Sequence, residues 1–192
     1  MYLLIGLGNP GRKFLKNRHN VGFMIIDSIA TKNEFPKFKK KNVSCVSVKI
    51  VQGKKIILLK PNTYMNNSGL SAIETKSFYK IKNENIFVFH DEIDLEASKI
   101  KIKTGGSNNG HNGLKSLDNY IGNNYNRIRV GVGRPLQSLL TKQDEHISKW
   151  VLSDFSVRDN ETWLHSTIEK TTYYFEDLLD KNFNKFLTNI YN

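Results

Sequence analysis

The stretch YLLIGLGNPG, residues 2–11, decides the fold class. Its first part, Tyr2 to Leu7, is a continuous apolar run, which is typical of a strand buried on both faces of a sheet. A compact apolar helix is predicted next, from Val21 to Ala30, with Asn20 as its N-cap. A buried strand followed by a helix indicates an α/β protein.

The rest of the chain continues this alternation of strands and helices. Gln52-Gly53-Lys54 separates two apolar runs, 43–51 and 56–59, which predicts a hairpin. The other predicted elements are a helix over 66–79, strands over 86–89 and 100–103, a short helix with Leu114, Leu117 and Ile121 on one face, a strand with Ile128, Val130 and Val132, and a long amphipathic C-terminal helix with Leu164, Ile168, Phe175, Leu178, Leu179 and Phe186. We therefore expect one α/β domain over residues 1–192, a sandwich whose mixed, largely parallel sheet is flanked by helices.

Length and composition fit one soluble domain. With 192 residues and 39% hydrophobic residues, the chain can bury a full core, and no segment resembles an interdomain linker or a repeat. The N-terminus runs directly into the first strand, without a basic region or a cleavage site, and no apolar run approaches membrane-spanning length. We expect a cytoplasmic protein without a membrane partner. Cys45 is the only cysteine, which excludes internal disulfides and CxxC zinc sites.

The net charge is the strongest feature of the composition. A formal charge of +11 and a pI near 9.6 create a positive field over much of a small domain, which favours a polyanionic partner such as nucleic acid. The abundance of Lys, Asn and Ile supports an alternative, a soluble basic protein from a lysine-rich proteome. Charge alone does not decide between the two.

Polar residues gather where the predicted elements begin or end. Asn9 follows the first strand, and Asp91 follows the strand expected to end at residue 89, where an α/β sheet binds its ligands. Asn66 and Asn112 lie at helix starts, where backbone N–H groups point outward. Each asparagine alone is explained by helix capping, and Asp91 alone by a turn. Together with His19 they indicate an active site.

A dinucleotide-binding enzyme shares part of this pattern. Gly6, Gly8 and Gly11 match GxGxxG after a strand, and Asp27 follows at about the ribose-binding distance. That fingerprint must open a helix at once, however, whereas residues 12–18 are too polar to cover a sheet. The match is therefore superficial, and no nucleotide cofactor is expected.

A metal hydrolase is the other alternative, with His90, Asp91, Glu92 and Asp94 as possible ligands. On a strand, His90 and Glu92 would point away from Asp91, and the chain has no HExxH motif. A GxSxG nucleophile elbow is also missing from the sequence. The remaining residues suggest that a histidine base activates water and that amides hold a carbonyl substrate, without a metal.

Six motifs occur in order along the chain: GLGNPG, RHNVG, PNTYMNNSG, HDEID, GGxxxGHNGLK and RIRVGVGRP. In these motifs the chain resembles the bacterial peptidyl-tRNA hydrolases. The similarity spans nearly the whole sequence and weakens after about Trp150. The resemblance implies hydrolysis of the ester that joins a stalled peptide to tRNA, on a monomeric α/β fold without metal or cofactor.

The resemblance also implies roles for individual residues. It makes His19 the base that deprotonates water and Asp91 the group that fixes its tautomer and stabilises the imidazolium. An imidazole suits this role because its ordinary pKa of about 6.5 leaves a large fraction of the rings neutral at cytoplasmic pH. Asn9 resembles the residue that helps to discriminate blocked from free aminoacyl-tRNA. Residues implied to line the cleft and hold the peptide and the terminal nucleotide are Tyr64, Met65, Asn66 and Asn112.

Basic residues on two predicted strands match the family's tRNA-binding positions. The resemblance implies that Lys103 and Arg129 grip the 5′ phosphate of the tRNA. We expect a basic track to extend from them over Lys99, Lys101, Arg127 and Arg134. An alternative interpretation of these residues is a set of solvated lysines and arginines on a strand face, and it is most plausible for Lys99.

Two positions depart from the family's pattern. Phe14 stands where the family commonly has tyrosine, so a hydroxyl is lost from the substrate-binding cleft. Residues 107–109, Ser-Asn-Asn, replace a more glycine-rich stretch, which puts the mobility of that loop in doubt. Neither departure changes His19, the residue assigned as the base. A non-catalytic RNA-binding relative of the same fold remains the alternative function.

Overall fold

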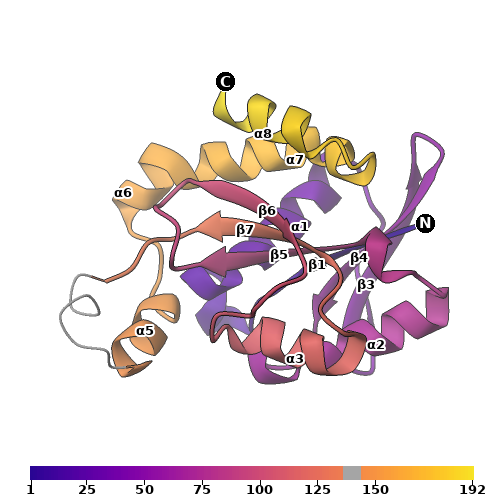
Figure 1. The fold of residues 1–192 in the computed structure, drawn as a ribbon, viewed down its shortest axis with the longest axis horizontal. Coiled ribbons are helices and arrows are strands. Elements are labelled where there is room, and N and C mark those ends of the chain that lie inside the picture. Colours follow the sequence, from indigo (N-terminus) through magenta and orange to yellow (C-terminus); the bar gives the residue numbers. More distant parts are fainter. Residues whose placement is uncertain (136–143) are drawn as a thin grey trace.

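The computed structural model describes residues 1–135 and 144–192 (Figure 1). Its strands are β1 (Tyr2–Gly6), β2 (Lys39–Lys41), β3 (Ser44–Val51), β4 (Lys54–Pro61), β5 (Ile86–Glu92), β6 (Ile100–Thr104) and β7 (Asn126–Gly131). Its helices are α1 (Val21–Lys32), α2 (Ser68–Tyr79), α3 (Asn112–Ile121), α5 (Asp144–Val151), α6 (Val157–Asp159), α7 (His165–Leu179) and α8 (Phe183–Tyr191). Within the described ranges, no helix has the length and apolar character to cross a membrane.

The strands form one mixed sheet in the order β2-β3-β4-β1-β5-β7-β6. β1 pairs in parallel with β4 and with β5, and β5 pairs in parallel with β7. β3 and β4 form the predicted hairpin, and β6 is antiparallel to β7, so the antiparallel pairs lie toward the edges. The parallel centre follows from the apolar runs in β1, β4 and β5, because such strands are buried on both faces.

Helices cover both faces of the sheet, as predicted for a sandwich (Figure 1). α1, α7 and α8 enclose one apolar cluster, which includes Leu4, Phe89 and Phe186. α2 and α3 enclose a second cluster on the other face, which includes Leu3 and Leu117. Alternate residues of β1 face the two clusters, so this central strand contributes to both halves of the core.

Two predicted elements end elsewhere than expected. β5 continues beyond residue 89 to Glu92 because β7 extends the ladder alongside it, and Asp91 is therefore the second-last residue of the strand. The single long C-terminal helix predicted from the apolar spacing is wrong, because the chain forms α7 and α8 with a break between them. Lys181 makes this break with a left-handed φ of 56°. Lysine does not signal such a turn, whereas glycine would.

Candidate active site

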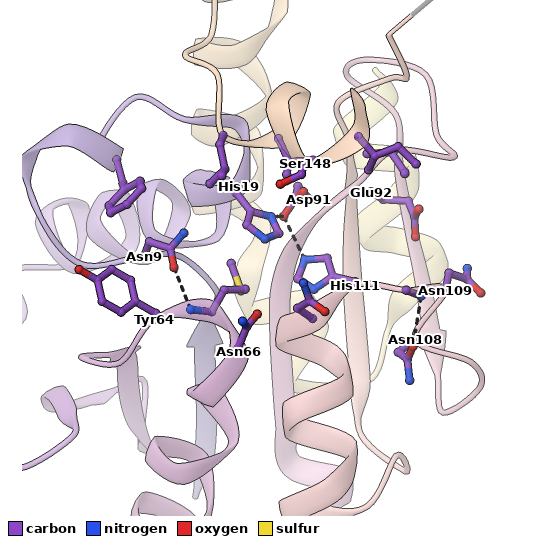
Figure 2. Close-up of a pocket in the computed structure, with 18 of the residues that line it drawn as sticks. Asn9, His19, Tyr64, Asn66, Asp91, Glu92, Asn108, Asn109, His111 and Ser148 are labelled. Carbon is purple, nitrogen blue, oxygen red and sulfur yellow. Dashed lines mark hydrogen bonds and ion pairs between the residues drawn. The ribbon is translucent and has the colours of Figure 1, made fainter. Parts of the chain in front are cut away.

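A cleft of about 830 Å³ opens at the carboxyl ends of the parallel strands (Figure 2). Of the residues that the sequence analysis assigned to the site, those that line the cleft are Asn9, Phe14, His19, Tyr64, Met65, Asn66, Asp91 and Asn112. Lys103 and Arg129 do not line it. Helix α5 closes another side of the cleft, with Ile147, Ser148 and Val151.

Two glycines bring His19 to this end of the sheet. A Cβ atom on Gly6, at the end of β1, would overlap the backbone of Gly22 in the first turn of α1. A Cβ atom on Gly22 would overlap the backbone of Phe89 and Leu7. The start of α1 therefore packs directly on β1 and β5, and the short 3₁₀ turn η2 (Arg18–Asn20) that precedes it holds His19 beside the end of β5. Gly6 thus serves helix packing, and α1 begins at residue 21, not at the glycine-rich turn.

Asp91 lies between two histidines (Figure 2). Its Oδ1 atom is 2.8 Å from Nδ1 of His19 and 3.0 Å from Nε2 of His111. His111 also caps α3, because its Nδ1 accepts the backbone N–H groups of Gly113 and Leu114 at 3.1 and 3.3 Å. An imidazole nitrogen that accepts these bonds carries no proton, so Nε2 carries it and donates to Asp91.

The carboxyl group of Asp91 is ionised in this arrangement. The side chain is 2% exposed, and burial alone would raise its pKa. The neighbouring His19 and His111 outweigh this effect and hold the pKa of Asp91 well below its usual range. An ionised Asp91 accepts the Nδ1–H of His19, which leaves Nε2 of His19 as the basic nitrogen.

His19, Asp91 and His111 also meet the spacing of a metal site, since one ligand atom from each lies within 4.8 Å of the others. A divalent ion at this point would need both ring nitrogens that face Asp91 to be deprotonated. At His111 the backbone contacts place the proton on that nitrogen. Histidine and carboxylate ligands of zinc, at about 2.0–2.2 Å from the ion, would also lie farther apart than these hydrogen-bonded atoms. The trio therefore fits a hydrogen-bonded network better than a metal site.

Three hydrogen bonds hold Asn9 beside the cleft. Asn20 accepts from the backbone N–H of Asn9 and donates to its carbonyl oxygen, each at 2.9 Å. The side-chain oxygen of Asn9 accepts the backbone N–H of Met65 at 2.8 Å, which leaves the amide NH₂ for a ligand (Figure 2). Asn20 occupies the N-cap position of α1, as predicted, but its side chain makes no capping bond and holds the Asn9 loop instead.

The remaining cleft residues form a polar rim with an aromatic end. Asn66 lies in the short 3₁₀ turn η3 (Met65–Asn67), and Asn112 is the first residue of α3; both side chains are exposed to the cleft. His111, not Asn112, is the N-cap of α3. Phe14 packs edge-on against Tyr64 with ring centroids 6.2 Å apart, so this position keeps an aromatic contact without a hydroxyl.

A sequence profile of the family described as Peptidyl-tRNA hydrolase matches residues 3–192. The chain belongs to the peptidyl-tRNA hydrolase family. The peptidyl-tRNA hydrolases of Rickettsia canadensis (strain McKiel) and Rickettsia felis (strain ATCC VR-1525 / URRWXCal2) are each 46% identical to it over 191 residues, which cover 99% of this chain and 100% of theirs. The crystal structure of peptidyl-tRNA hydrolase from Acinetobacter baumannii has the same fold, with a TM-score of 0.89 at 31% identity. The match covers 99% of this chain and 94% of that one.

In this peptidyl-tRNA hydrolase family member, the two basic residues expected to grip tRNA lie on one face of the β6–β7 ladder. Lys101 pairs with Arg129, and Lys103 pairs with Arg127, so Lys103 and Arg129 are diagonal neighbours. Glu92 accepts a bond from Nε of Arg129 at 3.0 Å. This carboxylate lowers the net charge of the pair, but the bond leaves the two terminal nitrogens of Arg129 for an anion.

One residue of the predicted basic track, Arg127, is buried. Arg127 is 2% exposed, and it donates to Asp118 at 2.9 Å and to the carbonyl of Ser107 at 2.7 Å. It therefore ties the 105–110 loop to α3 and is not available to tRNA. Arg134 is paired with Asp94 at 2.6 Å. The sequence shows only the alternation of basic residues, whereas their partners come from distant helices and loops.

Two residues important to the site were missed by the sequence analysis. His111 lies in the GHNGLK motif, but its contact with Asp91 depends on how α3 docks, which periodicity does not reveal. Arg18 lies directly before His19 and is 5% exposed; it donates to the carbonyl of Asp154 at 2.6 Å and to Asp159 at 2.9 Å. Its guanidinium stacks 3.7 Å from the ring of Trp150 in α5. Arg18 thus joins the His19 segment to the helix that closes the cleft.

Proposed function

We propose that the protein hydrolyses the ester between the peptide and the tRNA of peptidyl-tRNA released prematurely from ribosomes, and so recycles tRNA. One observation carries the proposal: His19 is held by an ionised Asp91 through Nδ1, so that its Nε2 is a free base at the cleft. Family membership supplies the substrate class.

The reaction follows from the tautomer of His19. A water molecule attacks the ester carbonyl while Nε2 of His19 takes its proton, and a tetrahedral intermediate forms. The intermediate collapses with loss of the ribose hydroxyl, which recovers the proton from His19. Asp91 stabilises the imidazolium between these steps, since its carboxylate already accepts the Nδ1–H. His111 keeps Asp91 in place through the second bond to Oδ1.

Uncharged amides hold the substrate around the base. The NH₂ group of Asn9 faces the cleft, and Asn66 and Asn112 line it from two other elements. Each amide offers donors and an acceptor without a charge to desolvate, which suits a peptide backbone and a terminal nucleotide. We assign the 5′ phosphate of the tRNA to Lys103 and Arg129. Such contacts are independent of sequence, as an enzyme that accepts many tRNAs requires.

The wider setting follows from the substrate. The proposal places a single catalytic domain over residues 1–192 in the cytoplasm, where translation produces peptidyl-tRNA. It needs no metal or cofactor, because the hydrogen-bonded trio of His19, Asp91 and His111 supplies the base and its support. It also needs no second subunit, since the cleft of one chain contains the base, its carboxylate and the amides.

The test compares an N-blocked aminoacyl-tRNA with its free counterpart, each with and without a chelator. We expect cleavage of the blocked substrate, little cleavage of the free one, and no effect of the chelator. His165→Ala is the matched control for a His19→Ala variant, because His165 is an exposed histidine on α7 outside the cleft. Binding of tRNA without turnover would instead identify a non-catalytic relative, and loss of activity with the chelator would reject the metal-free mechanism.

A further inference from the structure

A second groove, of about 390 Å³, lies between α2 and the β2–β3 edge of the sheet. It shares no lining residue with the cleft that contains His19. Its apolar floor includes Val46 and Val48 of β3, and Thr75, Phe78 and Tyr79 of α2 form a wall. A groove of this size matches a single nucleotide or a few peptide residues better than a folded partner.

The rim of the groove is basic. Lys39 pairs with Val46 and Lys41 pairs with Ser44, and paired residues share a face of the sheet. Lys39 and Lys41 therefore project on the side of α2, and Lys37 joins them at the rim. Glu74 is the one carboxylate among the lining residues, and it already accepts bonds from Asn42 and Ser44. The groove thus has a positive balance and fits an anionic occupant.

An aromatic ring stands at this basic rim. Phe78 is 65% exposed, although other residues of its helix are buried. Nζ of Lys41 lies 4.4 Å from the centroid of the Phe78 ring, and Tyr79 packs edge-on against that ring with a centroid distance of 4.8 Å. These contacts hold the ring beside a cation. An exposed ring next to lysines is the combination that binds unpaired bases and the phosphates attached to them.

Two serine hydroxyls in the groove are already used within the protein. The hydroxyl of Ser47 donates to the carbonyl of Pro36 at 2.6 Å, and that of Ser44 donates to Glu74 at 3.3 Å. They offer little to distinguish one base edge from another, so recognition here depends on stacking and charge. Lysines on an edge strand also prevent strand pairing between molecules. That role explains β2 alone, but it does not explain the exposed Phe78 or the groove beside it.

We propose that the groove between α2 and β2 binds a single-stranded RNA segment without sequence preference, with a base on Phe78 and phosphates on Lys37, Lys39 and Lys41. It is separate from the tRNA contacts at Lys103 and Arg129, because β2 and β6 are the opposite edges of the sheet. The strand spacing puts these edges roughly 29 Å apart. In Figure 1, β3 and α2 lie away from α5, which closes the catalytic cleft.

The test measures binding of a fluorescent single-stranded oligouridylate to the full-length protein by anisotropy, over a range of salt concentrations. Phe78→Ala should weaken binding by about tenfold, and Phe78→Trp should retain it, because a larger ring also stacks. Replacing Lys37, Lys39 and Lys41 together by alanine should lower the salt slope by about 2, since each phosphate contact contributes about 0.7 on a single strand. All these side chains are exposed, so thermal melting should change little.

Matched controls separate the groove from general charge and from the catalytic cleft. A triple alanine variant of Lys32, Lys181 and Lys185 removes the same charge from other surfaces and should change oligouridylate binding less. The groove variants should hydrolyse a short N-blocked aminoacyl ester at the normal rate. In a Lys103→Ala, Arg129→Ala background, the loss caused by Phe78→Ala should stay the same, because distant sites act independently.

Three outcomes would overturn the proposal. Equal losses for the rim and control lysine variants would reduce the rim to general charge and edge protection. Unchanged binding in Phe78→Ala would remove the stacking contact. Binding of an acidic peptide that depends on Phe78, while oligouridylate binding does not, would identify the groove as a protein-docking site. Competition with full-length tRNA then tests whether the single-stranded segment bound in the groove is part of the tRNA substrate. If the groove variants bind tRNA more weakly than the native protein does, the tRNA itself contacts this groove.

Discussion

Acid should destabilise this protein through His90, a buried histidine that the proposed reaction does not use. The residue is 1% exposed, and its Nδ1 donates to the carbonyl of Asp91 at 2.7 Å. Nε2 is buried without a hydrogen-bond partner among the described residues. Burial, and to a smaller extent the neighbouring His111, lowers the pKa of His90 to about 3. The folded protein therefore keeps this ring neutral.

The size of the effect follows from the difference between the folded and unfolded states. In the unfolded chain an imidazole has a pKa of about 6.5. Between that pH and about 3, the unfolded state binds a proton that the folded state rejects, so the free energy of unfolding falls as the pH falls. The His90 contribution amounts to roughly 2 kcal/mol between about pH 8 and pH 5. Asp91 does not contribute in this window, because its lowered pKa affects stability only below about pH 3.8.

Urea unfolding of the native protein and of His90→Asn, at several pH values from about 5 to 8, isolates this contribution. The asparagine retains an N–H group for the carbonyl of Asp91 but has no titratable group. The free energy of unfolding of the native protein should fall more steeply with acid than that of the variant, by roughly 2 kcal/mol over the range. Parallel curves for the two proteins would refute the account of His90 as a buried neutral ring.

Three further predictions concern the reaction. His19→Ala should lose orders of magnitude in kcat while tRNA affinity, measured by filter binding, survives; near-normal turnover would remove His19 from the mechanism. Asp91→Asn should lose less activity and alter the pH–rate profile, since an amide supports the wrong imidazole tautomer, and an unchanged rate and profile would reject that role. Lys103→Ala or Arg129→Ala should raise KM for full-length substrate far more than for a short aminoacyl-nucleotide ester, with non-additive losses in the double variant. Equal, additive losses on both substrates would exclude a shared phosphate.

Much of the fold could be predicted because its signals are local. The apolar runs of β1 and β4 and the Gln52-Gly53 turn of the hairpin each lie within a few neighbouring residues. The break before α8 carries no such signal, since Lys181 adopts a left-handed conformation that the sequence does not mark. The end of β5 depends on its neighbour β7, which lies far along the chain and sets how far the ladder extends.

The members of the site were easier to predict than their contacts. Asn9, His19 and Asp91 stand out in short polar motifs, and the structure brings them to one cleft. The partners of Asn20 and Arg127 could not be predicted, because the same residue types serve equally well as a helix cap or as a surface cation. Tertiary packing selects between these roles. A sequence motif identifies which residues gather, while docking of the helices determines which atoms meet.

The contact between Gly6 and Gly22 makes the spacing of the base and its carboxylate a property of the main chain. Substitutions that change the size of core side chains can shift how the layers pack. They should leave the distance between His19 and Asp91 unchanged. The reason is that Gly6 and Gly22 meet through backbone atoms, and backbone atoms have no side-chain rotamers that could change. The geometry of the base and its carboxylate is therefore insensitive to most core substitutions. It is sensitive at positions such as Gly6 and Gly22, where one added methyl group would push α1 away from the sheet.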